Sequence, residues 1–192
     1  MVVVKFVIWV TLAYFIGNIS PSILLGKAAG VDIKKEGSGN AGTTNALRVL
    51  GKKAAVITLV IDIGKGVLAV FLGTHFGDEI IGMACALAVF CGHIWPCLYG
   101  FKGGKGVATA FGAILAVNWV LALATLLIVG IGLTGTRRMS VGSLLGAVTF
   151  PISCRFFEPD FFYIGIIMAI IVIIKHSANI KRLIKGEEPK MF

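Results

Sequence analysis

Residues 106–136 read GVATAFGAILAVNWVLALATLLIVGIGLTGT and contain no charged side chain. As a single helix at about 1.5 Å per residue the run would be about 45 Å long, and the hydrocarbon core of a bilayer is roughly 30 Å thick. Asn118-Trp119 lies near the middle, and tryptophan is typical of a membrane–water interface. We therefore predict two short spans, 107–117 and 120–135, on either side of this turn.

The rest of the chain has the composition of a membrane protein. Of its 192 residues, 57% are hydrophobic and 14% are charged, whereas soluble domains carry about 25% charged residues. The apolar run within residues 1–26 is longer than the hydrophobic region of a usual signal peptide, so we interpret these residues as part of a retained first span. The remaining apolar runs predict spans at 3–25, 54–76, 80–98, 140–154 and 161–174. We expect an all-α polytopic protein with seven transmembrane helices, in a single domain covering residues 1–192.

The net charge of +9 would suggest nucleic acid for a soluble protein, but here it indicates topology. With seven spans, fifteen basic residues fall in loops on one face and only Lys5 and Arg155 on the other. The fifteen are Lys27, Lys34, Lys35, Arg48, Lys52, Lys53, Lys102, Lys105, Arg137, Arg138, Lys175, Lys181, Arg182, Lys185 and Lys190. The positive-inside rule then predicts an outside N-terminus and a cytoplasmic C-terminus. Six spans would divide these residues between the faces. We expect no nucleic-acid partner, and short re-entrant or amphipathic segments on the cytoplasmic side.

The first polar loop contains GSGNAGTTNALR at residues 37–48. Glycines allow backbone N–H groups to converge on an anion, and a short helix capped by Thr43 or Thr44 would direct its N-terminus at a phosphate. The spacing also matches the dinucleotide fingerprint, but that motif requires a preceding strand and here a membrane helix precedes it. A merely flexible loop is the alternative. The density of polar groups beside Arg48 favours anion binding.

The second polar loop contains GFKGGKGVAT at residues 100–109. It lacks the spacing of a Walker A loop, yet it places Lys105 among glycines at the start of a helix, which suits an anion. His93 precedes this loop, near the cytoplasmic end of the span 80–98. A histidine in a membrane segment is often functional, although a purely structural role is the alternative.

Three shorter patterns add polar groups to the predicted spans. Ser140 and Ser143 begin the span 140–154. His176 and Asn179 are three residues apart, so a helix would present both on one face. Asp62 and Lys65 have the same spacing and are expected to pair. We favour structural charge compensation for this pair over a substrate role.

Several common catalytic arrangements are missing from the sequence. It has no Gly-x-Ser-x-Gly nucleophile motif, no His-x4-Asp pair and no carboxylate cluster that would hold a catalytic metal. We therefore expect no metal and no cofactor. The loops are predicted to bind phosphorylated substrates without a covalent protein intermediate.

Together these motifs resemble one family, the bacterial acyl-phosphate-dependent glycerol-3-phosphate acyltransferases. The similarity extends over almost the whole chain, and it rests on residues 38–45 with Arg48, Gly92-His93 with Pro96, residues 103–109, Asp62-x-x-Lys65-Gly66 and His176-x-x-Asn179-Ile180. The resemblance implies transfer of a fatty acyl group from acyl phosphate to the 1-hydroxyl of glycerol 3-phosphate. It implies a multi-pass protein of the bacterial inner membrane with a cytoplasmic active site. We expect a monomer in contact with membrane lipid, near a soluble enzyme that makes acyl phosphate.

The candidate residues divide into two groups. The catalytic candidates are Lys105, His93, His176 and Arg48. The substrate-binding candidates are Ser38, Gly39, Asn40, Gly42, Thr43, Thr44, Asn45, Gly103, Gly104, Gly106, Thr109, Ser140, Ser143 and Asn179. The general base is left open between His93, His176 and the substrate's own phosphate. A transporter for a phosphorylated metabolite and a structural membrane protein are the alternatives from other classes.

Overall fold

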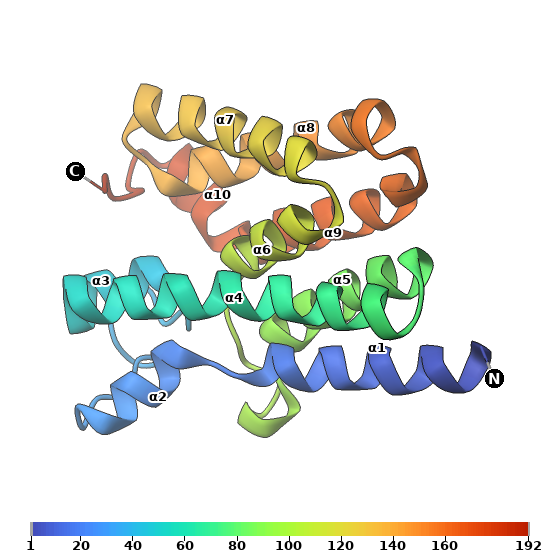
Figure 1. Cartoon of the computed structure of the whole chain (residues 1–192). Coiled ribbons are helices and arrows are strands. Elements are labelled where there is room, and N and C mark those ends of the chain that lie inside the picture. The colour runs from blue at the N-terminus through green and yellow to red at the C-terminus, as the bar shows by residue number, and fades with distance from the viewer. Residues whose placement is uncertain (1, 192) are drawn as a thin grey trace. The chain divides into compact units, whose positions relative to one another are not determined.

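Most of the long apolar runs are helical in the computed structural model, which describes residues 2–191. Within that range the secondary structure is helical, without strands (Figure 1). The α-helices are α1 (Val2–Asn18), α2 (Pro21–Ala28), α3 (Thr43–Leu50), α4 (Lys52–Phe76), α5 (Glu79–Ile94), α6 (Val107–Val117), α7 (Trp119–Thr136), α8 (Met139–Phe157), α9 (Phe162–Lys175) and α10 (Ser177–Ile184). Two short 3₁₀ helices are η1 (Cys97–Tyr99) and η2 (Pro159–Phe161). The predicted all-α class is confirmed.

The chain divides into two compact units. Residues up to Val117 form unit 1, in which α1, α4 and α5 pack against one another and α6 packs on α4 and α5. Residues from Asn118 onwards form unit 2, in which α8 packs against both α7 and α9.

Small residues allow the helices of each unit to approach closely. In unit 1 a Cβ added to Gly66 of α4 would lie 2.6 Å from the backbone nitrogen of Ala113 in α6. In unit 2 a Cβ added to Gly132 of α7 would lie 2.8 Å from Cα of Gly142 in α8. Close contact through small residues is typical of helices that associate inside a bilayer.

Five helical segments of the described chain are long and apolar enough to cross a membrane. They are Val2–Ala28, Lys52–Phe76, Glu79–Tyr99, Trp119–Thr136 and Met139–Phe157. A sixth would combine Pro159–Lys175 and Ser177–Ile184, which meet at an angle of 55°, while Val107–Val117 is a shorter apolar helix. The count of seven spans and the orientation of the termini therefore stay predictions.

The break predicted near Asn118 is present. Its side-chain oxygen accepts hydrogen bonds from the backbone nitrogens of Val120 at 2.9 Å and Leu121 at 3.0 Å, which caps the start of α7. Its side-chain nitrogen donates to the Phe157 carbonyl and to the Glu158 carboxylate, each at 3.0 Å. One asparagine thus begins α7 and ties it to the end of α8.

The predicted first span contains a second break, which the sequence analysis missed. α1 ends at Asn18, Ser20 is extended with φ −116° and ψ 91°, and α2 begins at Pro21. Proline lacks a backbone N–H and disfavours a helical residue before it. The backbone carbonyls near the break therefore lose helical partners and become available as acceptors for other groups.

Candidate active site

Asn45 shapes the first glycine-rich loop in unit 1. Its side-chain oxygen accepts from the Ser38 backbone nitrogen at 2.8 Å. Its side-chain nitrogen donates to the carbonyls of Ile33 at 3.1 Å and Glu36 at 3.0 Å. The side chain is 1% exposed, and both of its N–H groups are used, so the geometry makes Asn45 an organiser of the loop.

The loop ends at the N-terminus of α3. The prediction that Thr43 or Thr44 caps this helix is wrong. Gly42, with extended backbone, is the N-cap, and no side chain caps the helix, because Thr43 and Thr44 already lie inside its first turn. The Thr43 hydroxyl is buried and has no hydrogen-bond partner among residues 2–191. The Thr109 hydroxyl at the start of α6 is likewise buried and has no hydrogen-bond partner among the described residues. Buried polar groups normally have partners, so both hydroxyls can receive one from a bound molecule.

The second glycine-rich loop docks onto the end of α5. The backbone nitrogens of Gly103 and Gly104 donate to the carbonyls of Ile94 at 3.1 Å and His93 at 3.2 Å. A Cβ added to Gly104 would collide with His93 Nε2 and would lie 2.6 Å from the Ala41 carbonyl oxygen. Gly104 therefore marks the place where the two glycine-rich loops meet. Lys105 follows it and is partly buried between two buried glycines.

A basic cluster lies beside these loops and was not singled out from the sequence. Lys34 Nζ donates to the Tyr99 carbonyl at 3.0 Å, and it also lies 5.5 Å from the centre of the Tyr99 ring. Lys27 Nζ lies 5.7 Å from the same ring. Burial, together with the positive charges of Lys102 and Lys27, lowers the pKa of Lys34, and Asp32 only partly opposes this. Converging positive charges favour a bound anion.

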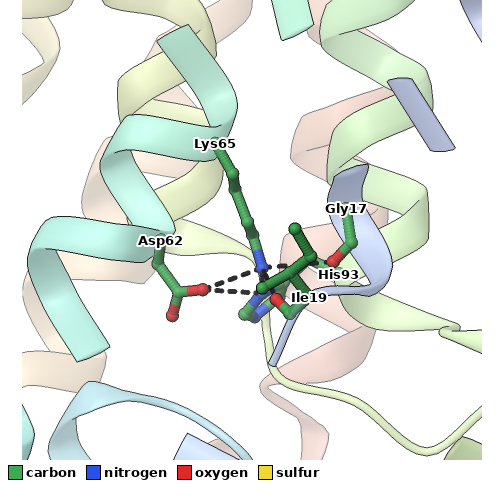
Figure 2. A network of polar contacts seen from close by, with 5 residues as sticks. All are labelled: Gly17, Ile19, Asp62, Lys65 and His93. Atoms are coloured by element: carbon green, nitrogen blue, oxygen red, sulfur yellow. Dashed lines mark hydrogen bonds and ion pairs between the residues drawn. The ribbon is translucent and has the colours of Figure 1, made fainter. Parts of the chain in front are cut away.

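A polar network lies inside unit 1, where α1, α4 and α5 meet (Figure 2). Lys65 Nζ is 2.8 Å from Asp62 Oδ1, so the predicted pairing is confirmed. It also donates to the carbonyls of Gly17 at 3.1 Å and Ile19 at 2.7 Å, beside the break between α1 and α2. His93 Nδ1 lies 2.7 Å from the same Nζ. The spacing predicted the Asp62–Lys65 pair but gave no sign of the histidine or of the two carbonyls.

In unit 2, Glu188 gathers the polar side chains predicted there. Its carboxylate accepts from Ser140 Oγ at 2.7 Å, Asn179 Nδ2 at 2.6 Å and Arg182 Nε at 2.7 Å. Arg138 Nε donates to the Glu188 backbone carbonyl at 2.9 Å. Burial raises the pKa of Glu188, but the hydrogen bonds and the charge of Arg182 outweigh it and lower the pKa from 4.5. The sequence analysis missed Glu188, although an acidic residue in a basic tail was a usable signal.

The other two candidates of unit 2 bond to backbone carbonyls four residues earlier in the chain. Ser143 Oγ donates to the Met139 carbonyl at 3.0 Å. His176 Nδ1 lies 2.8 Å from the Val172 carbonyl. Because a carbonyl oxygen only accepts, the proton of a neutral His176 ring is on Nδ1. Ser140 and Asn179 are thus brought together through Glu188.

Comparison with known proteins decides the family. The sequence profile described as glycerol-3-phosphate acyltransferase matches residues 7–186. This chain belongs to the glycerol-3-phosphate acyltransferase family. It is 43% identical to the glycerol-3-phosphate acyltransferase of Clostridioides difficile (strain 630), with 100% of this chain and 98% of the relative covered. It is 44% identical to that of Finegoldia magna (strain ATCC 29328 / DSM 20472 / WAL 2508), with 93% and 92% covered.

Solved structures agree with this family assignment. The chain is similar to PlsY (YgiH), an integral membrane glycerol 3-phosphate acyltransferase, in its glycerol 3-phosphate form, with a TM-score of 0.91 and 31% identity over 96% of this chain and 94% of that one. The lysophosphatidic acid form of PlsY gives a TM-score of 0.87 and 32% identity over the same shares. The family and the enzyme class predicted from the motifs are confirmed, as is an integral membrane protein. The roles of individual site residues stay predictions.

Proposed function

We propose that the protein transfers a fatty acyl group from acyl phosphate to the 1-hydroxyl of glycerol 3-phosphate, releasing 1-acyl-glycerol 3-phosphate and inorganic phosphate. The observation that carries this proposal is the meeting of two glycine-rich loops, one with Arg48 and one with Lys105, at Ala41 and Gly104 in a member of this family. The reaction needs no protein nucleophile, because acyl phosphate is a mixed anhydride with a good leaving group. The alcohol can attack the acyl carbon directly once both substrates are aligned.

In unit 1 the loops supply the proposed phosphate contacts. The N–H groups of Ser38, Gly39 and Gly42 already donate within the loop. The backbone N–H groups at positions 40, 41, 43 and 44 therefore hold one phosphate, helped by the Ser38 hydroxyl. Lys105 and Arg48 neutralise phosphate charge, and Lys105 or neighbouring amides stabilise the oxyanion that develops on the acyl carbonyl. The remaining proposed contacts are Asn40, Thr43, Thr44, Gly106 and Thr109. The predicted contacts Gly39, Gly42, Gly103, Gly104 and Asn45 instead shape the loops, because their N–H groups or side-chain amide already bond to other residues. The unsatisfied hydroxyls of Thr43 and Thr109 support this assignment.

In unit 2 the proposed contacts with glycerol 3-phosphate are the polar side chains Ser140, Ser143, His176 and Asn179. Hydroxyl and amide groups orient an alcohol by hydrogen bonds, and such alignment lowers the barrier to attack. The convergence of Ser140 and Asn179 on one carboxylate supports their acting together. The proton released by the alcohol goes to a histidine or to the substrate's phosphate.

We further propose seven membrane spans, with the N-terminus outside and the glycine-rich loops and C-terminus in the cytoplasm. The separation of α6 from α7 at Asn118 and the one-sided distribution of basic loop residues support this topology. The protein would act as a monomeric single domain in the bacterial inner membrane, supplied by a soluble enzyme that makes acyl phosphate. Labelling of single cysteines in intact cells tests the topology: position 78 should react from outside and position 102 should not.

An assay with purified protein in detergent tests the reaction. Acyl phosphate and glycerol 3-phosphate should yield lysophosphatidic acid, and acyl-CoA in place of acyl phosphate should not. A preparation that forms no product but carries glycerol 3-phosphate into liposomes would favour the transporter alternative. A matched preparation of the Lys105→Ala variant controls for contaminating acyltransferases.

A further inference from the structure

Three ionisable side chains meet inside the apolar helices of unit 1. Figure 2 shows the side chains of Asp62, Lys65 and His93 directed toward one another. Lys65 is 4% exposed, Asp62 1% and His93 6%. Ionisable groups inside a membrane segment are costly to retain. A single salt bridge needs only the lysine and the aspartate, so the third member requires its own explanation.

The ammonium group of Lys65 determines whether His93 Nδ1 can carry a proton. A lysine ammonium has three N–H donors and no acceptor. The carbonyls of Gly17 and Ile19 accept two of them, at 3.1 and 2.7 Å. His93 Nδ1, at 2.7 Å, and Asp62 Oδ1, at 2.8 Å, share the third, because both face the ammonium group at hydrogen-bond distance. Asp62, 2.8 Å from Nζ, balances the charge.

A neutral His93 ring with its proton on Nδ1 conflicts with this geometry. A proton on Nδ1 could point at Asp62 Oδ1, 3.3 Å away. It would then lie beside the ammonium nitrogen only 2.7 Å from Nδ1, so that two donors would face each other. A neutral His93 ring therefore carries its proton on Nε2.

Nε2 lies at the junction of the two glycine-rich loops. The space next to it is taken by Gly104, where a Cβ would collide with Nε2 and would lie 2.6 Å from the Ala41 carbonyl oxygen. The backbone of the same histidine also receives the Gly104 N–H, at 3.2 Å. A hydrogen-bond donor, not a base, is thus presented where both loops converge.

We propose that Asp62 and Lys65 are positioning residues that hold His93 as its Nε2–H tautomer, so that His93 donates a hydrogen bond at the loop junction and does not act as the general base. This inference deepens the proposed function and rests on it for the identity of the reaction. The base is then His176 or the substrate's own phosphate. His176 has the opposite tautomer, because its Nδ1 proton is directed at the Val172 carbonyl.

Nitrogen-15 NMR of protein labelled only in histidine tests the tautomer without using activity. The chain has three histidines, and the variant His75→Gln, at an exposed position, helps to assign the signals. At neutral pH the proton of His93 should be on Nε2 and that of His176 on Nδ1, so each ring is a control for the other. In Lys65→Met the His93 proton should move to Nδ1, where Asp62 accepts it. Wild-type His93 with its proton on Nδ1 would overturn the proposal, whether or not the variant folds.

The kcat values of His93 variants distinguish a hydrogen-bond donor from a general base at this position. Glutamine can place an amide N–H near the position of Nε2 but cannot act as a base at neutral pH, whereas phenylalanine can do neither. His93→Gln should lose less than about tenfold in kcat, as expected when one neutral hydrogen bond replaces another, and His93→Phe should lose more. If His93 were the base, both variants should lose about 10²–10⁴-fold, which would overturn the donor role. Absence of acyl transfer in wild type would instead refute the proposed reaction and leave the tautomer result standing.

Discussion

Replacing Glu188 by alanine should destabilise the protein more than any other change to its C-terminal tail. The carboxylate is 6% exposed and accepts hydrogen bonds from Ser140, Asn179 and Arg182 at 2.6–2.7 Å. Removing it leaves three donors without their acceptor and Arg182 without its counter-ion.

The loss of stability expected for Glu188→Ala can be estimated from the surroundings of the carboxylate. Breaking a buried ion pair by removing one partner costs about 3–5 kcal/mol. The Arg182 side chain is 32% exposed and can be solvated, so we expect about 3 kcal/mol, near the lower end of that range. At about 2–4 °C per kcal/mol for a chain of this size, Tm should fall by roughly 6–12 °C. Glu188→Gln retains one acceptor oxygen and should cost about 1–2 kcal/mol.

Thermal unfolding in detergent at pH 7 is the assay, with Glu187→Ala as the matched control. Glu187 is exposed, and a surface substitution of this kind changes stability by less than about 0.5 kcal/mol. If Glu188→Ala and Glu187→Ala unfolded at the same temperature, the carboxylate would not hold α8 and α10 together as described.

The pH dependence of the same variants provides a second test. Since the pKa of Glu188 is lowered from 4.5 in the folded protein, the folded state binds this proton less tightly than the unfolded state. Its contribution is complete above the unfolded-state pKa and is lost as the pH falls through the lower folded-state value. The Tm difference between wild type and Glu188→Gln should therefore shrink as the pH is lowered from 7 to about 3. A difference that stayed constant would refute the charge-based explanation.

Three further predictions concern packing, capping and catalysis. Gly66→Ala should destabilise the protein by about 1–3 kcal/mol, because the added Cβ meets the backbone of α6. Gly64→Ala, at a position with no heavy atom within 4 Å of the new Cβ, should be neutral or stabilising, and equal Tm changes would contradict this packing. Asn118→Ala should cost about 0.5–2 kcal/mol through loss of the α7 cap; an unchanged Tm would count against that role. Lys105→Ala should lower kcat/KM by about 10²–10³-fold, and wild-type turnover would remove Lys105 from the site.

Features set by nearby residues were predictable from the sequence. The break at Asn118 was predicted because a charge-free run of that length exceeds the bilayer thickness. The Asp62–Lys65 pair was predicted because three-residue spacing brings two side chains together on any helix. Both predictions required only helix geometry and the properties of the bilayer.

Features that depend on distant partners were not predictable. His93 is 28 residues from Lys65, and Ser140 is 48 residues from Glu188. Asn45 resembles a polar loop residue in the sequence, and only folding of the loop around it commits its amide to three backbone groups. The α1–α2 break was overlooked because hydropathy stays high across it. The dipeptide Ser20-Pro21 did indicate a break, because a residue before proline disfavours the helical conformation.

The stoichiometry of the reaction tests the central claim most directly. Purified wild-type protein should release one inorganic phosphate from acyl phosphate for each lysophosphatidic acid formed, and it should release almost none when glycerol 3-phosphate is omitted. Phosphate release that did not depend on glycerol 3-phosphate, or lysophosphatidic acid formed without phosphate release, would contradict direct transfer between the two phosphorylated substrates.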